Sequence, residues 1–387
     1  MPRGMSPLYC AVTIRTTGAG DASRHSPART VGSTAMESGS GSTADALARL
    51  RHHGDAEVAP GLLDFAVNVQ GDGPPEWLRR RLADAVAGLG PYPSADAGRR
   101  AREQVAVRHG RTPAEVLPLA GGAEGFAMLP RLGVREAALI HPSFTEPELA
   151  LREAGVAVTR VTLDAPFRLD PSAVPDSADL VVLGNPTNPT SVLHPVADVL
   201  ALRRPGRILV VDEAFMDAVP GETESVAGRS LPDVLVLRSL TKTWALAGLR
   251  CGYALGHPDL LERLVRGRAH WPVGSLQLEA ITACSEPAAV AEAQEKARRV
   301  GTDRAVAVAL LREAGIEVRT PAAAPFLLLR LPDGERMRAH LRWRGIAVRR
   351  CDTFPGLGPD FLRIAVRPRT LTEQLIEAMR ELTREML

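Results

Sequence analysis

The stretch SLTKTWALAGLRCGYALG, residues 239–256, places a lysine directly after two hydroxyl residues and before an apolar, glycine-rich run. Lysine is rare in this chain, whose basic residues are nearly all arginine. A lone lysine after a strand is ordinarily a solvated loop residue. Here Ser239, Thr241 and Arg250 surround Lys242 in the sequence with groups that can bind a phosphate. The pattern S-x-[ST]-K-x7-R is much more specific than any of its letters.

The composition is that of a soluble globular protein, with 45% hydrophobic and 24% charged residues in a chain of 387. A formal net charge of +2 gives no electrostatic reason for nucleic-acid binding, and no apolar run approaches the roughly 20 residues that cross a membrane. The four cysteines are far apart and form no C-x-x-C pair or metal-ligand cluster. We therefore expect a reduced, cytoplasmic protein with no metal, nucleic-acid or membrane partner.

Short apolar, β-branched runs alternate with helical patterns from about residue 136. The runs are EAALI, VAVTRV, DLVVLG, RILVVDEAF, DVLVLRS and CGYALG. Such alternation predicts a mostly parallel sheet covered on both faces, in an α/β domain. Ligands of open sheets bind at the carboxyl ends of the strands, which is where GNPTNPTS, DEAF and SLTK fall.

Four regions follow from composition and periodicity. Residues 1–43 are rich in Ser, Gly, Thr and Arg, so we expect a disordered N-terminal extension. Residues 44–110 are predicted to form an N-terminal arm and part of a small domain. Residues 111–275 are predicted to form the large domain, and residues 276–387 the C-terminal small α+β domain.

The lysine segment resembles the cofactor-binding segment of the fold-type I pyridoxal-phosphate (PLP) enzymes, the aminotransferase superfamily. The resemblance implies an α/β fold with a large, mostly parallel-sheet domain and a small α+β domain. It also implies that Lys242 binds PLP and that Ser239, Thr241 and Arg250 hold its phosphate. A PLP site further needs a carboxylate at the pyridine nitrogen, a donor for the ring hydroxyl and a stacking partner.

Each of these three groups has a candidate in the chain. VVDEAF supplies Asp212, whose charge would keep the pyridine nitrogen protonated. NPTNPTS is similar to the family turn N-P-x-N-P-T-G and places Asn188 against the ring hydroxyl, with Ser191 in place of the usual glycine. HPSFTEPE supplies Phe144 as the stacking aromatic, and a core phenylalanine is the alternative.

The segment LAGGAEGFAML resembles the family's G-x-x-E turn at the start of a helix. Free backbone N–H groups and the positive end of the helix bind the cofactor phosphate there. The resemblance assigns this role to the amides of Gly122 and Ala123, with Gly121 permitting close approach.

Substrate recognition is expected from the C-terminal segment VRRCDTFPGLGPDFLRIAVR. The resemblance matches Arg363 to an arginine that grips the substrate α-carboxylate in a bidentate fork. It matches Arg349 to a second arginine, which in some relatives holds a distal phosphate, although a solvated strand residue is the alternative. His53 and Asn68 are candidate substrate contacts, with turn residues as the alternative.

The N-terminal third narrows the branch of the superfamily. RHHGDAEVAPGLLDFAVNVQGDGPPEWL followed by LGPYPSADAG resembles the opening of the threonine-phosphate decarboxylases of cobalamin biosynthesis. In that likeness Tyr92 reaches the cofactor phosphate of a second subunit, which implies a homodimer. Phe215 favours the same branch, because histidinol-phosphate aminotransferases usually carry tyrosine there.

We therefore expect a PLP enzyme that acts on a phosphorylated amino acid or amine, with threonine-phosphate decarboxylation as the preferred reaction. The alternative is a histidinol-phosphate aminotransferase of histidine biosynthesis. The two reactions differ in the orientation of the substrate carboxylate, whereas their residue inventories are alike. A transcription regulator with a PLP domain is a third class, but about 43 residues before the core are too few for a DNA-binding module.

Overall fold

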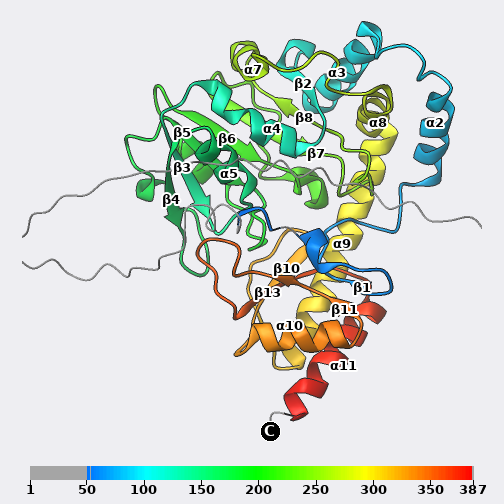
Figure 1. Cartoon of the computed structure of the whole chain (residues 1–387), viewed down its shortest axis with the longest axis vertical. Coiled ribbons are helices and arrows are strands. Elements are labelled where there is room, and N and C mark those ends of the chain that lie inside the picture. The colour runs from blue at the N-terminus through cyan, green and yellow to red at the C-terminus, as the bar shows by residue number, and fades with distance from the viewer. Residues whose placement is uncertain (1–49, 53, 386–387) are drawn as a thin grey trace, which may run out of the picture. The chain divides into compact units, whose positions relative to one another are not determined.

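The computed structural model describes residues 50–52 and 54–385 of the chain. The extension predicted at 1–43 and the candidate substrate contact His53 lie outside the described residues. The larger sheet has seven strands in the order β2-β8-β7-β6-β5-β3-β4 (Figure 1). Its strands are β2 Val116–Leu119, β3 Glu136–His141, β4 Ala157–Thr162, β5 Leu180–Gly184, β6 Ile208–Asp212, β7 Val234–Ser239 and β8 Gly252–Leu255.

The predicted mostly parallel sheet is confirmed. Pairs from β4 through β7 are parallel, whereas β8 runs antiparallel to both β7 and β2. The edge strand β2 is not among the predicted strands, because Pro118 interrupts its apolar run. The polar segments after β5, β6 and β7 leave the sheet at one edge, as the alternation of strands and helices predicts.

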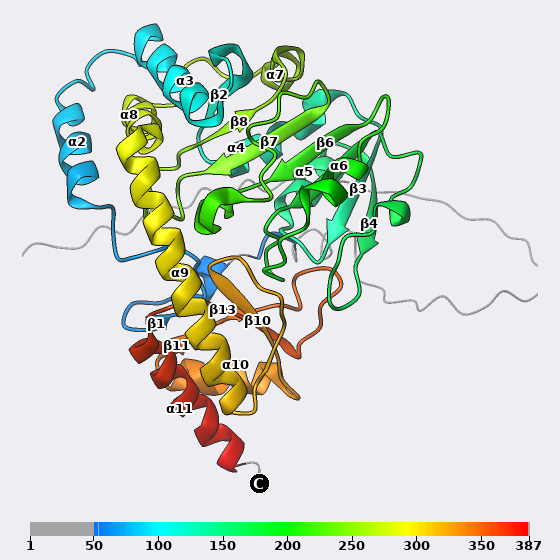
Figure 2. The ribbon, with the colours of Figure 1, turned by 180° about the vertical axis from the view of Figure 1, so that it is seen from behind.

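Successive side chains of each central strand enter different cores. In β5, Val181 and Leu183 belong to the core on one face, and Leu180 and Val182 to the core on the other. The first core includes residues of α2 Glu76–Val86, α3 Ala95–His109, α6 Val196–Ala201 and α8 Ser275–Ser285. The second includes residues of α4 Gly122–Met128, α5 Glu146–Glu153 and α7 Pro258–Val265. Figures 1 and 2 show the sheet between these two layers.

A smaller sheet and three helices enclose a separate core. The four strands are β9 Glu317–Val318, β10 Phe326–Arg330, β12 Arg349–Arg350 and β13 Phe361–Ala365, in the order β12-β13-β10-β9. A parallel pair, β1 Leu63–Asp64 with β11 Ile346–Ala347, adds the N-terminal segment to this part. The helices are α9 Pro287–Glu313, α10 Gly334–Trp343 and α11 Arg369–Glu385, and α9 runs from α8 to this core (Figure 2).

Short elements and caps complete the described chain. The 3-10 helices are η1 Gly54–Glu57, η2 Pro113–Glu115, η3 Leu129–Leu132, η4 Pro171–Ala173, η5 Met216–Ala218 and η6 Pro220–Glu222. Helix α3 begins after Ser94, whose Oγ accepts the N–H of Ala97, and ends at Gly110 with φ of 63°. Among the described helices, none is long and apolar enough to cross a membrane.

Candidate functional site

A cavity of about 570 Å³ lies at the carboxyl ends of β6 and β7. Nearly all of the described residues that the sequence nominated for the site line it, the exceptions being Tyr92 and Gly121. These residues are Asn68, Gly122, Ala123, Phe144, Asn188, Asp212, Ser239, Thr241, Lys242, Arg250, Arg349 and Arg363. They come from segments spread over nearly 300 residues of the chain, so the fold gathers the predicted groups in one place.

Asp212 is the last residue of β6, and its Oδ1 accepts the N–H of Ala214 at 3.0 Å. Burial raises the pKa of Asp212 to about 6, while the Ala214 N–H and the charge of Lys242 act in the opposite direction. Because burial makes the ionised form of this carboxylate less stable, a cation bound close to it would stabilise that form. Asp212 therefore fits a protonated ring nitrogen in the cavity.

Lys242 lies in the loop that follows β7. Its carbonyl oxygen accepts the N–H of Gln70 at 2.9 Å, so the lysine loop is fixed to the N-terminal segment. Trp244 is fully buried two residues later; its ring forms a T-shaped pair with that of Trp77, with centroids 5.6 Å apart, and the Lys296 ammonium lies 4.1 Å from its ring centroid. These contacts hold the loop that carries the amine.

Hydroxyl, amide and guanidinium groups converge beside this loop. The Oγ atoms of Ser239 and Thr241 lie 2.7 Å apart. Gly121, with φ of 85°, turns the chain into α4, and a Cβ there would lie 3.1 Å from Nη2 of Arg250. Glycine is needed at this position for both its positive φ and the close approach of Arg250. The cluster fits a phosphate group.

Arg363 is 4% exposed and reaches across to the large sheet. Its Nη1 donates to Oδ1 of Asn188 at 2.6 Å and its Nη2 to the carbonyl of Ala66, whereas Nε has no protein partner in the described chain. Burial, and then the charge of Arg349, lower its pKa. A guanidinium stays protonated in proteins, so the lowered pKa indicates a buried charge that an anion would stabilise.

Arg349 is 2% exposed and faces the same cavity. It donates to the carbonyls of His52 and Arg350, each at 2.8 Å, and to Oγ1 of Thr353 at 2.7 Å. In the described part of the chain neither Arg349 nor Arg363 forms an ion pair with a carboxylate. Two buried guanidinium groups without a paired carboxylate in the described chain favour an anionic group bound beside them.

The remaining nominated residues occupy different surroundings. Asn68 is 3% exposed, lines the cavity and has an Oδ1 atom without a partner in the described chain. Phe144 lines the cavity and also contacts the ring of Phe126, so it belongs to both the site and the adjoining core. Tyr92 lies outside the cavity, 73% exposed, with its ring stacked on Trp271 at 4.3 Å.

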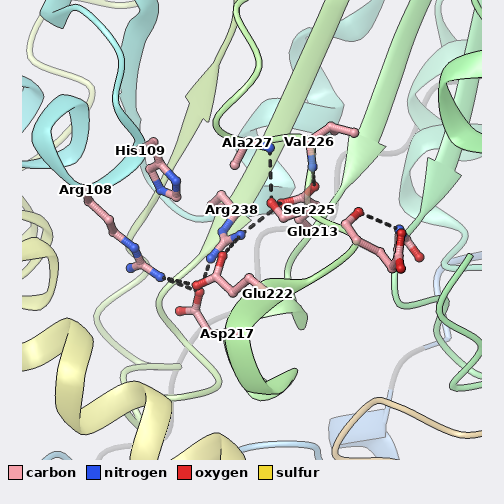
Figure 3. Close-up of polar contacts among 12 residues, drawn as sticks. Arg108, His109, Glu213, Asp217, Glu222, Ser225, Val226, Ala227 and Arg238 are labelled. Atoms are coloured by element: carbon pink, nitrogen blue, oxygen red, sulfur yellow. Dashed lines mark hydrogen bonds and ion pairs between the residues drawn. The ribbon is translucent and has the colours of Figure 1, made fainter. Parts of the chain in front are cut away.

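Sequence reasoning missed a group of buried charges beneath the strand ends (Figure 3). Arg238 in β7 is 1% exposed and lies among carboxylates from the segment after β6. A charged letter in the apolar run VLVLRS was the available signal. It also missed His52 and Phe354, which line the cavity.

The site residues fit PLP. The buried Asp212 carboxylate can pair with a protonated ring nitrogen, the donors near Arg250 can bind a phosphate, and the amine of Lys242 lies in the same cavity. An open, mostly parallel sheet with these groups at its carboxyl edge defines a fold-type I PLP-dependent enzyme. The chain belongs to the family of class I and II aminotransferases, whose sequence model matches residues 60–382. The predicted superfamily, cofactor and enzymatic nature are confirmed.

The proteins similar in sequence to this chain include histidinol-phosphate aminotransferases and a threonine-phosphate decarboxylase. The chain is 61% identical over 322 residues to histidinol-phosphate aminotransferases of Mycobacterium bovis and Mycobacterium tuberculosis, covering 83% of this chain and 88% of each relative. It is 31% identical over 334 residues to the threonine-phosphate decarboxylase of Salmonella typhimurium, covering 82% of this chain and 90% of the relative. The alternative reaction therefore has stronger support than the one preferred from the sequence.

Solved structures agree on the fold. A histidinol-phosphate aminotransferase of Clostridium acetobutylicum matches with a TM-score of 0.77 at 23% identity, covering 84% of this chain and 100% of that one. An L-threonine-O-3-phosphate decarboxylase of Porphyromonas gingivalis matches with a TM-score of 0.72 at 24% identity and the same coverage. At these identities the likeness shows the fold alone.

Proposed function

We propose that this chain is a PLP-dependent aminotransferase that acts on histidinol phosphate or a similar phosphorylated amine. The relatives at 61% identity support this choice. The structural observation that carries it is the burial of Arg349 and Arg363 in the same cavity as Asp212 and Lys242, with no carboxylate paired to either arginine in the described chain. Two such cations favour substrates that carry a phosphate or carboxylate.

Each site residue receives a role in this proposal. When bound, PLP withdraws electrons from the substrate Cα and so makes its proton acidic. Lys242 holds the cofactor and moves the proton at that carbon. Asp212 holds the ring nitrogen charged, Asn188 and Phe144 orient the ring, and the donors of Ser239, Thr241, Arg250, Gly122 and Ala123 bind its phosphate.

Transamination uses two anionic substrates in turn, which suits a cavity with two arginines. The phosphorylated amine brings a phosphate, and an amino-acid partner such as glutamate brings carboxylates. Arg363 and Arg349 can bind either anion, because a guanidinium forms paired hydrogen bonds with both. Asn68, with its unpartnered Oδ1, adds an acceptor for a substrate N–H or O–H.

Threonine-phosphate decarboxylation is the second candidate, and two observations favour it. Its substrate carries a phosphate and a carboxylate on one molecule, which matches two arginines in one cavity. Phe215 lines that cavity and packs edge-on against Phe326 at 4.9 Å, so no hydroxyl is available there to assist Asn188. In this reaction the carboxylate that Arg363 orients leaves as carbon dioxide.

Two incubations of the purified holoenzyme separate the candidates. Histidinol phosphate with 2-oxoglutarate should give glutamate and the corresponding ketone, with no product when the keto acid is omitted. Incubation with O-phosphothreonine in the absence of a keto acid should release no detectable carbon dioxide. Release of carbon dioxide together with an amino-alcohol phosphate, and no glutamate from histidinol phosphate, would overturn the aminotransferase proposal in favour of the decarboxylase.

We also infer that the protein is a cytoplasmic homodimer. The stacked rings of Tyr92 and Trp271, 73% and 55% exposed, form an aromatic surface outside the cavity of their own chain. Large exposed aromatics of this kind mark contact sites. By resemblance to the family, Tyr92 would bind the cofactor phosphate in the site of a second subunit.

A further inference from the structure

A buried ion cluster lies beneath the carboxyl ends of β6 and β7, and it consists of Arg108, Arg238, Glu213, Asp217 and Glu222 (Figure 3). Nη1 of Arg238 lies 2.9 Å from Oε2 of Glu213 and 2.7 Å from Oε2 of Glu222, and Nη2 pairs with Asp217. Nη2 of Arg108 lies 2.8 Å from Asp217 and 3.0 Å from Glu222. Arg238 thus binds all three carboxylates.

Stability alone does not account for this cluster. The side chains of Arg238 and Glu213 are 1% and 0% exposed, so both charges lose nearly all of their hydration. Buried ion pairs are often no more stabilising than well-packed apolar side chains of the same volume. What such a cluster does supply is a fixed geometry for the segments that carry it.

The cluster is linked to Asp212 through a single peptide. Strand alternation directs Asp212 and Glu213 to opposite faces of the sheet, as it does Val210 and Val211. Glu213 accepts hydrogen bonds from Arg238 at 2.9 Å, from Ser225 Oγ at 2.6 Å and from the Val226 N–H at 2.7 Å. The next N–H along the chain, that of Ala214, donates to the Asp212 carboxylate.

The same cluster is linked to the lysine loop through Arg238. This residue directly precedes Ser239, whose Oγ contacts Oγ1 of Thr241 at 2.7 Å, and Lys242 follows. Asp212 and Leu237 are partners in the register of β6 and β7, so the two strand ends lie side by side. The ion pair between Glu213 and Arg238 therefore joins the segment of the acid to the segment of the amine.

We propose that Glu213 and Arg238 are positioning residues that fix the Asp212 carboxylate relative to the Lys242 loop, and so set how PLP is held. Arg238 is among the residues that line the cavity, at the end of β7, while its guanidinium is paired with the carboxylates of the ion cluster. The two positioning residues act from the other face of the sheet, Glu213 through the Ala214 N–H and Arg238 through the end of β7. The proposal rests on the PLP dependence of the family and holds for either candidate substrate.

A matched pair of variants tests this role, since Glu213→Gln and Glu222→Gln each remove one carboxylate from Arg238. Only Glu213 is bonded to the peptide that orients Asp212. We expect Glu213→Gln to weaken PLP binding about tenfold or more, to change the visible circular dichroism of bound PLP, and to lower kcat more than it raises KM. Glu222→Gln should lower the melting temperature comparably, yet leave PLP affinity and the dichroism within about twofold of the wild type.

Ser225→Ala provides a milder second variant, because it removes one donor to Glu213 and leaves every charge in place. We expect it to shift the visible dichroism and PLP affinity in the same direction as Glu213→Gln, by a smaller factor. Equal effects of Glu213→Gln and Glu222→Gln on PLP affinity, or an unchanged dichroism in both Glu213→Gln and Ser225→Ala, would overturn the proposal. PLP affinity, the visible dichroism and the melting temperature need no substrate, so these three readouts are independent of which reaction the enzyme performs.

Discussion

Arg363 of the small-sheet region donates a hydrogen bond of 2.6 Å to Oδ1 of Asn188, in the turn that follows β5 of the large sheet. An anion bound to Arg363 is therefore held beside the residue assigned to the cofactor ring. A lysine at position 363 keeps the charge but cannot keep the fork that reaches both Asn188 and Ala66.

We accordingly expect Arg363→Lys to lower kcat/KM about 100-fold, or roughly 2.7 kcal/mol, with PLP still bound. Steady-state kinetics and the visible spectrum measure the two effects. Arg350→Lys is a suitable control, because Arg350 pairs with Asp352 and does not line the cavity. Comparable kinetics for the Arg363→Lys variant and the wild type would remove Arg363 from substrate binding.

Ser191 stands where the family usually has glycine, and its φ of 65° is left-handed. Its Oγ accepts the N–H of Ala324 at 2.9 Å, and its carbonyl accepts that of Ala323 at 2.8 Å. Ser191→Ala loses the Oγ bond and retains the backbone strain, whereas Ser191→Gly loses the same bond and relieves the strain.

We expect Ser191→Ala to lower the free energy of unfolding by about 1–2 kcal/mol relative to the wild type. The free energy of unfolding of Ser191→Gly should be about 1 kcal/mol higher than that of Ser191→Ala. Urea denaturation of both variants beside the wild type measures this order. A glycine variant less stable than the alanine variant would show that the left-handed backbone carries no penalty here.

The pKa of Asp212, raised by burial to about 6, makes a prediction for the cofactor-free protein. The folded state holds a proton that the unfolded state releases near pH 4, so stability falls as pH rises from about 4 through 6. Asp212→Asn removes this penalty and still offers an oxygen to the Ala214 N–H.

The cofactor-free Asp212→Asn protein should thus be more stable than the cofactor-free wild type at pH 7.5, by about 1–3 kcal/mol, with a smaller gain at pH 5. Its affinity for PLP should fall, because the acid that holds the ring nitrogen is gone. Urea denaturation at both pH values measures the gain. Equal stability of the two cofactor-free proteins at pH 7.5 would contradict the raised pKa.

Tyr92 is assigned to the site of a second subunit, and this can be tested by complementation. In the proposed homodimer, Lys242→Ala and Tyr92→Ala each damage both sites of their own dimer. A mixed dimer contains one site with both residues intact, so unfolding and refolding equal amounts together should restore about one quarter of wild-type activity. No recovery, with mixed dimers shown by mass to be present, would place Tyr92 outside the partner's site.

Apolar runs and polar strand ends predicted the central strands and the edge where the site lies, and the family resemblance nominated the individual site residues. The continuous runs before Gly184, Asp212 and Ser239 became the central parallel strands, and the residues after them share one cavity. The cluster around Arg238 was not predicted, because its pairs join residues far from one another in the sequence, 25 apart for Arg238 and Glu213 and 109 apart for Arg108 and Asp217, and so leave no local pattern. Tyr92 lies outside the cavity of its own chain, and its proposed ligand belongs to another copy of the chain.

Lys242 is proposed as the amine that holds PLP, beside Asp212. The visible absorbance spectrum of Lys242→Ala, purified with added PLP and then freed of excess cofactor, tests this most directly. We predict that the absorbance of lysine-bound PLP is absent and that borohydride treatment attaches no cofactor to the chain, while the variant keeps the wild-type fold by far-ultraviolet circular dichroism. A yellow Lys242→Ala protein with cofactor fixed by borohydride to another residue would contradict the account.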